Sequence, residues 1–197
     1  MKQQQRIQNL TKLALLIALL AILTFTPLGF IMVPPVSITI MHIPVIIGAV
    51  LMGPVYGGVL GFSFGLFSMI KASYAAASPV DMLFSPFFAA SPLDALKSIV
   101  MCFLPRILLG VFAALLYRTF RRCIHNTPVS VGVAAALASV LHTVMVLGCL
   151  WLFFDGIAFK AIFATFLTVN GLIELAAAPL IAVPVCSALM RRKQSYD

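Results

Sequence analysis

The sequence predicts an all-α integral membrane protein with six transmembrane helices and both ends of the chain in the cytoplasm. Of its 197 residues, 62% are apolar and 9% are charged, whereas a soluble domain usually carries about 25% charged residues. The apolar residues form long runs, and a run of about 18 or more is typical of a membrane-spanning helix. Strand-type alternation is absent from these runs, which argues against a membrane barrel. We therefore treat residues 1–197 as one membrane domain.

Six apolar segments are expected to be helical, because lipid offers no hydrogen-bond partner to free backbone groups. They cover residues 10–25, 42–52, 55–74, 98–117, 129–154 and 161–190. The second segment is short, since a helix rising about 1.5 Å per residue needs some 20 residues to cross a hydrocarbon core of about 30 Å. It either gains length from residues 36–41 or lies partly inside the protein. The sixth is long enough to tilt or to extend into the cytoplasm.

The connections between these segments carry turn signals. Residues 53–58 (GPVYGG) form a breaker cluster that predicts a short cytoplasmic turn between the second and third helices. Pro34-Pro35 lies in the connection between the first and second helices. A long extracellular loop between the third and fourth helices, residues 75–97, holds three Ser-Pro steps, which favour turns or helix starts. Both extracellular loops either rest at the membrane interface or cover a binding pocket.

The distribution of positive charge predicts the orientation in the membrane. Nine cationic residues precede the first segment, follow the fourth or follow the sixth: Lys2, Arg6, Lys12, Arg118, Arg121, Arg122, Arg191, Arg192 and Lys193. Lys71, Lys97 and Lys160 fall on the other side. By the positive-inside rule, the side with nine cations is cytoplasmic. The net charge of +8 is therefore interpreted as membrane-orienting charge rather than as a nucleic-acid-binding surface.

Three glycines predict close packing of the third helix. Gly57, Gly61 and Gly65 recur at every fourth position, so they share one helix face that another backbone can approach closely. We expect this helix to lie in the centre of the bundle. Residues 61–65 (GFSFG) also fit the nucleophile pattern Gly-x-Ser-x-Gly, although the strand–turn–helix context of that pattern is missing. An intramembrane hydrolase that uses Ser63 with His142 as its base is one alternative function.

Arg106, His142 and Glu174 are ionisable residues near the middle of their segments. Such a group costs a few kcal/mol at a helix centre and needs a partner or a purpose. Asn170 precedes Glu174 by four residues and shares its helix face. Arg106 either pairs with Glu174 or binds an anionic ligand group, because a guanidinium matches the two oxygens of a carboxylate. Asn170 and Glu174 could then receive hydroxyl or amide groups, and His142 either contacts the ligand or bonds between helices.

The sequence predicts no cofactor, no metal and no catalytic residue. A Gly-x-x-x-x-Gly-Lys-[Ser/Thr] phosphate loop is absent, and neither the four cysteines nor the histidines and carboxylates have the spacing of metal ligands. A small membrane protein with a binding pocket then uses an ion gradient or the ATPases of partner subunits. Glu174 is the carboxylate within a span, so a stand-alone proton-coupled secondary transporter is a further alternative.

A series of short motifs resembles a known family. The first segment contains Ala14 and Ala18 in an Ala-x-x-x-Ala step, and it is followed by residues 41–44 (MHIP), 53–58, 104–110 (LPRILLG) and 169–174 (VNGLIE). In this order the motifs resemble the substrate-binding S components of energy-coupling factor (ECF) vitamin transporters, over nearly the whole chain. His42 in the second motif is expected to cap or flank the short helix.

The resemblance implies a high-affinity vitamin-binding subunit of an ATP-driven importer, multi-pass in the bacterial cell membrane. It implies partnership with a transmembrane coupling subunit and two ATPase subunits that hydrolyse the ATP. Ala14 and Ala18 match the step that contacts the coupling subunit in this family, since small residues leave a flat face for another helix. Packing of these alanines within the chain itself is the alternative.

The Pro105-Arg106 pair and residues 169–174 look most like the pantothenate-specific branch of the family. Pantothenate has a carboxylate for Arg106, and hydroxyl and amide groups for Asn170, Glu174 and His142. The branches for riboflavin, pyridoxine and thiamine precursors share parts of this layout and remain alternatives. An uncharged vitamin would leave Arg106 to pair with Glu174.

Overall fold

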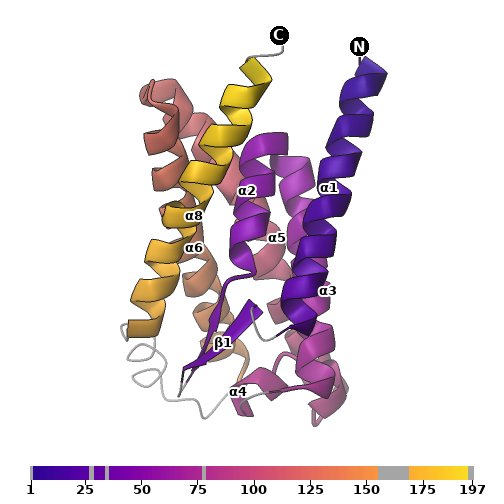
Figure 1. The fold of residues 1–197 in the computed structure, drawn as a ribbon. Coiled ribbons are helices and arrows are strands. Elements are labelled where there is room, and N and C mark those ends of the chain that lie inside the picture. Colours follow the sequence, from indigo (N-terminus) through magenta and orange to yellow (C-terminus); the bar gives the residue numbers. More distant parts are fainter. Residues whose placement is uncertain (1, 27–28, 34–35, 77–78, 155–168, 195–197) are drawn as a thin grey trace.

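The long helices lie side by side in a bundle (Figure 1). The computed structural model describes residues 2–26, 29–33, 36–76, 79–154 and 169–194. Within these residues, five helices are long and apolar enough to cross a membrane. They belong to α1 (Lys2–Phe25), α3 (Pro54–Tyr74), α5 (Pro92–Cys123), α6 (Thr127–Phe153) and α8 (Val169–Gln194). The prediction of an all-α membrane protein is confirmed for these elements. The predicted start of the sixth segment, residue 161, lies outside the described residues.

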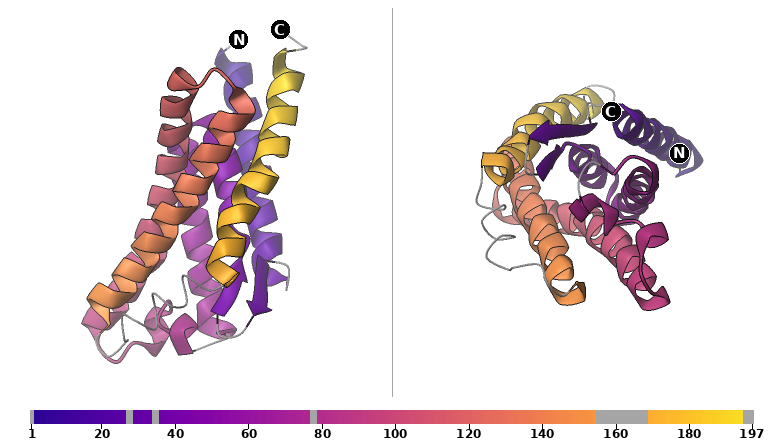
Figure 2. Two further views of the ribbon diagram at one scale, coloured as in Figure 1. Left: turned by 90° about the vertical axis from the view of Figure 1, so that its left-hand side faces the viewer. Right: turned by 90° about the horizontal axis from the view of Figure 1, so that it is seen from below.

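The two ends of the bundle differ. Both chain termini and the connection from α5 to α6 lie at one end, whereas β1 and α4 (Pro79–Met82) lie at the other (Figures 1 and 2). One end of the bundle therefore carries the clusters of Lys and Arg. These clusters precede the apolar run of α1 or lie at the ends of α5 and α8. Which end of the bundle faces the cytoplasm stays a prediction from these charges.

One part of the chain that we expected to be a loop is paired. Strands β1 (Phe30–Val33) and β2 (Val36–Thr39) form an antiparallel hairpin in which Phe30 faces Thr39 and Ile31 faces Ile38. β-Branched and aromatic residues favour strands, and pairing gives their backbone groups partners near the membrane. The all-α prediction is therefore incomplete at this connection.

The short helix α2 (His42–Met52) lies inside the protein. Its nine residues from His42 to Val50 are all buried, and they pack in one core with residues of α1, α3, α5, α6 and α8, among them Leu20, Leu60, Leu109, Val131 and Ala182. Figure 2 shows α2 enclosed by the other helices when the bundle is seen along its axis. Residues 36–39 form a strand and add no length to the helix. Of the two interpretations of this segment, burial inside the protein is confirmed.

The three glycines of α3 form its contact with α5. A Cβ atom added to Gly57 would collide with the carbonyl of Gly110, and one added to Gly61 would collide with the carbonyl of Arg106. At Gly65 the added atom would lie 2.8 Å from the carbonyl oxygen of Cys102. The predicted close backbone approach is confirmed. The expected central position of α3 is wrong, because α2 occupies the centre and α3 exposes its opposite face, including Val55 and Phe62.

We predict that Gly61→Ala destabilises the protein. The new methyl group has to push α5 away at Arg106, and overpacking of this kind costs about 1–3 kcal/mol. Gly148→Ala in α6 is the matched control, because a Cβ there meets nothing within 4 Å and alanine favours a helix over glycine. Thermal unfolding in detergent should show a lower midpoint for Gly61→Ala alone. Equal midpoints for the two variants would contradict the close α3–α5 contact.

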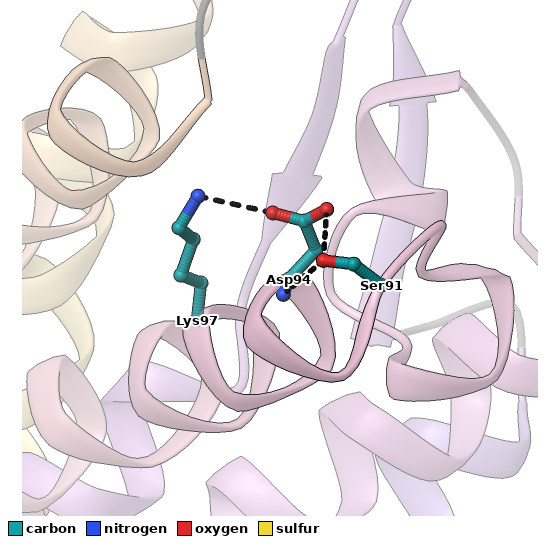
Figure 3. A network of polar contacts seen from close by, with 3 residues as sticks. All are labelled: Ser91, Asp94 and Lys97. Atoms are coloured by element: carbon teal, nitrogen blue, oxygen red, sulfur yellow. Dashed lines mark hydrogen bonds and ion pairs between the residues drawn. The ribbon is translucent and has the colours of Figure 1, made fainter.

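The connection from α3 to α5 is more ordered than the predicted loop, residues 75–97. Each of its Ser-Pro steps leads into a helix, since α4, η2 (Pro86–Phe88) and α5 all begin at proline. Ser91 caps α5 by accepting a hydrogen bond from the backbone N–H of Asp94 at 3.2 Å, and Lys97 binds the Asp94 carboxylate at 3.0 Å (Figure 3). This capping arrangement starts α5 six residues before the expected segment. The helix thereby reaches from one end of the bundle to the other.

Candidate functional site

Arg106 follows a proline that interrupts the hydrogen bonding of α5. Pro105 has no backbone N–H, so the carbonyl of Met101, four residues earlier, loses its usual helical donor. The guanidinium replaces that donor, since Nη1 of Arg106 donates to the Met101 carbonyl at 2.7 Å. The Pro105-Arg106 pair thus anchors one corner of the guanidinium on its own helix. The remaining N–H groups are left for other partners.

Two aromatic rings flank the guanidinium. Its Cζ lies 5.5 Å from the ring centroid of Phe64 in α3 and 5.0 Å from that of Phe84, in the turn between α4 and η2. Phe84 is held in place because its carbonyl accepts a hydrogen bond from Cys102 Sγ at 3.0 Å. Contacts of a cation with ring faces are favourable and offset part of the lost hydration. The rings therefore let a charged side chain remain in the interior.

Arg106 is buried, and the described part of the chain offers it no negative partner. The side chain is 7% exposed, and its Nε has no hydrogen-bond partner. Among the described residues, no carboxylate forms an ion pair with Arg106, and its electrostatic neighbours are Cys102 and Cys149. A buried charge without a counter-ion is costly. An anionic group beside the guanidinium would supply the counter-ion that the described residues lack.

His142 of α6 lies on the other side of Phe64. The centroids of the two rings are 6.0 Å apart, and Nε2 of His142 is buried without a hydrogen-bond partner. Arg106 interacts with His142 electrostatically. Three helices, α3, α5 and α6, thus bring Arg106, Phe64 and His142 together. The expectation that Arg106 and His142 lie at similar depth agrees with this arrangement.

Glu174 binds the β-hairpin instead of Arg106. Its Oε1 accepts a hydrogen bond from the backbone N–H of Thr39 at 2.6 Å, which links α8 to the end of β2. The side chain is half-buried. Asn170 lies in the first turn of α8, and its side chain lies outside the described residues. Of these two residues, which we expected to share a helix face, the structure therefore describes the side chain of Glu174 alone.

Ala14 and Ala18 lie on the outer face of α1. Both are exposed, and Leu20 and Thr24 are the buried residues in the described part of this helix. Large apolar side chains such as Leu15 surround the alanines and face outward as well. Their exposure favours a contact outside this chain over packing within it, and the choice between the two stays a prediction.

Ser63 has the environment of an ordinary helical serine. It lies in the middle of α3, and its hydroxyl donates to the carbonyl of Val59 at 3.0 Å. A nucleophile of the Gly-x-Ser-x-Gly type sits instead on a sharp turn between a strand and a helix. Its hydrogen bond to the backbone of its own helix is the usual one for a serine within a helix.

Sequence reasoning missed Phe64, Phe84 and Thr39 as neighbours of the polar cluster. Each reaches the cluster through contacts between elements distant in sequence, and apolar residues such as Phe64 look like ordinary core residues. The anchor on the Met101 carbonyl did have a signal, because a proline at position 105 frees the carbonyl at 101.

Comparison with known proteins agrees with the motifs. The family model described as "ECF transporter, substrate-specific component" matches residues 8–186. The pantothenic acid transporter PanT of Lactococcus lactis subsp. cremoris (strain MG1363) is 29% identical over 170 residues, which cover 82% of this chain and 82% of that protein. The matched region contains Arg106, His142 and Glu174.

Proposed function

Because the chain belongs to the family of substrate-specific components of ECF transporters, we propose that it captures pantothenate at the outer side of the membrane and delivers it to partner subunits for import. The observation that carries this proposal is the buried guanidinium of Arg106, which has no carboxylate partner among the described residues and an unpartnered Nε. A ligand carboxylate would supply the missing counter-ion. Charge-assisted hydrogen bonds of this kind are among the strongest in proteins.

The carboxylate of the ligand would lie between Arg106 and His142. Both side chains carry an unpartnered buried nitrogen, and both adjoin Phe64. A guanidinium that keeps one N–H on the Met101 carbonyl still has donors for both oxygens of a carboxylate. Glu174 and Asn170, at the start of α8, would receive the hydroxyl and amide groups. The similarity to a protein named for pantothenic acid transport supports this vitamin over riboflavin, pyridoxine and thiamine precursors.

The membrane orientation completes the proposal. Six helices are embedded in the membrane, with α2 enclosed by the others, and both termini are cytoplasmic because the nine clustered cations belong to their end of the bundle. The long connection from α3 to α5, which begins after Tyr74, is then extracellular together with the β-hairpin. Phe84 and Thr39 are supplied by these outer segments, so the ligand enters from outside. The whole chain acts as one membrane domain.

Transport requires partners in this proposal. A transmembrane coupling subunit binds the outer face of α1 at Ala14 and Ala18, where the side chains are small and exposed. Two ATPase subunits bound to it provide the energy. Glu174 serves ligand binding rather than proton coupling, since its carboxylate accepts the Thr39 N–H and keeps further acceptor positions for the ligand.

A binding panel tests the proposal. The purified chain in detergent is titrated with pantothenate, riboflavin, pyridoxine and thiamine in a calorimeter. We expect saturable binding of pantothenate at a far lower concentration than any other vitamin. Tighter binding of an uncharged vitamin would overturn the assignment of Arg106 to a carboxylate, and with it the proposed substrate.

A further inference from the structure

We propose that His42 is an additional ligand-contacting residue, which forms a hydrogen bond with a hydroxyl group at the end of the ligand opposite the carboxylate. The inference rests on the proposed function and adds a second recognition point to it. It assigns His42, together with Glu174 and Asn170, to the hydroxyl groups at the far end of the ligand.

The first support is the burial of an unpartnered ring nitrogen. His42 is the first residue of α2 and is 4% exposed. Its Nε2 is buried and has no hydrogen-bond partner, although buried polar atoms in proteins are nearly always paired. The expectation that His42 caps the helix does not account for this atom, because the α2 N-terminus has no side-chain cap bond.

The second support is the chemistry of the groups that could pair with this nitrogen. The imidazole lies beside backbone groups of Thr39 and Glu174. A neutral imidazole has one N–H donor and one acceptor nitrogen. A hydroxyl group both donates and accepts, so it can pair with Nε2 whether or not that nitrogen carries the proton. A hydroxyl group therefore satisfies Nε2 without a charged partner.

The third support is the set of polar groups around His42. Glu174, whose backbone adjoins the imidazole, is a carboxylate with further acceptor positions beyond the one that the Thr39 N–H uses. His42 is close enough to His142 to affect its charge, and His142 adjoins Phe64, whose ring also lies against the guanidinium of Arg106. The cluster thus has donors at Arg106, acceptor positions at Glu174 and an unpartnered ring nitrogen at His42. A molecule with a carboxylate at one end and hydroxyl groups at the other complements this order, as pantothenate does.

The test compares variants of the two histidines in the full-length chain. His42→Ala should weaken binding of pantothenate about ten- to one-hundred-fold, which is the usual effect of removing one buried hydrogen-bond partner. His42→Gln, which keeps an acceptor near the position of Nε2, should recover part of the affinity. His125→Ala is the matched control, because His125 is exposed in the connection between α5 and α6. It should bind like the wild type.

A ligand without hydroxyl groups makes the test specific. A des-hydroxy analogue of pantothenate should bind the wild type more weakly than pantothenate does, whereas His42→Ala should discriminate much less between the two ligands. Equal discrimination by the wild type and His42→Ala would overturn the inference. If His42→Ala unfolds, His42→Phe, which fills the space without an acceptor, is compared with His42→Gln, and equal affinities of these two would overturn it.

The outcome separates this inference from the proposed function. Wild-type protein that fails to bind pantothenate contradicts the proposed function itself. Wild-type protein that binds pantothenate, with normal binding by both His42→Ala and His125→Ala, contradicts only the role of His42.

Discussion

Replacing Arg106 with alanine is expected to abolish detectable binding of pantothenate by the purified chain. The substitution would leave a ligand carboxylate in a buried position between aromatic rings, with no cation beside it. Truncating one partner of a buried, hydrogen-bonded charge pair costs about 2–5 kcal/mol, which corresponds to a loss of roughly thirty- to several-thousand-fold in affinity. Isothermal titration calorimetry of wild type and variant measures this loss directly.

Two further substitutions separate charge from geometry. Arg106→Lys keeps the positive charge but lacks the planar fork that bonds both the Met101 carbonyl and a carboxylate, so we expect an affinity between those of the wild type and Arg106→Ala. Arg122→Ala, at an exposed position at the end of α5, is the control and should bind normally. Unchanged affinity of Arg106→Ala would remove this residue from the site.

The stability of the ligand-free variant gives an independent readout. Arg106 has no ion-pair partner among the described residues, so its removal deletes a buried charge rather than breaking a pair. The midpoint of thermal unfolding without ligand should change little, because removal of an unpaired buried charge offsets the loss of the hydrogen bond to the Met101 carbonyl. A large decrease would indicate that Arg106 serves the fold.

The double substitution Ala14→Leu with Ala18→Leu is expected to eliminate uptake while leaving vitamin binding intact. Both alanines are exposed on α1, so we expect larger side chains there to leave the fold and the ligand site intact. In the complete transporter they would hold the helix of the coupling subunit away from α1, because close helix contacts in membranes depend on small residues. The measurement is ATP-dependent uptake of labelled pantothenate by proteoliposomes that contain all subunits.

A pair of alanines on another helix controls for altered lipid contacts. Ala176→Leu with Ala188→Leu adds the same groups to exposed positions of α8 and should leave uptake at the wild-type rate. Loss of pantothenate affinity in the α1 variant would show instead that Ala14 and Ala18 serve the internal fold. Normal uptake by that variant would exclude them from the interface.

The helices were predictable because membranes impose strong local rules. The segment 42–52 coincides with α2, and 55–74 differs from α3 by one residue. Glycine spacing predicted the close contact of α3, which the structure shows to be with α5, because a helix face without side chains lets another backbone approach. For α2 the sequence allowed either a helix lengthened by residues 36–41 or a helix partly inside the protein. Length and hydropathy do not decide between them, because they do not distinguish a residue facing lipid from one facing other helices.

The hairpin and the surroundings of the site required the structure. Strands of four residues each leave a weak pattern, and Pro34-Pro35 between them reads as a loop. Arg106, His142 and Glu174 stood out because ionisable residues are rare within membrane spans. Their partners did not, since contacts such as the bond from Thr39 to Glu174 join residues far apart in the chain. The pairing of Arg106 with Glu174 seemed equally reasonable from charge alone.

The carboxylate contact is tested most directly by exchanging the ligand's carboxylate for an alcohol in both wild type and Arg106→Gln. Calorimetry gives the affinities of pantothenate and of pantothenol for each protein. We predict that the wild type strongly prefers pantothenate and that Arg106→Gln loses most of this preference, because the guanidinium is what recognises the charge. The same preference in both proteins would contradict the central claim that Arg106 binds the carboxylate.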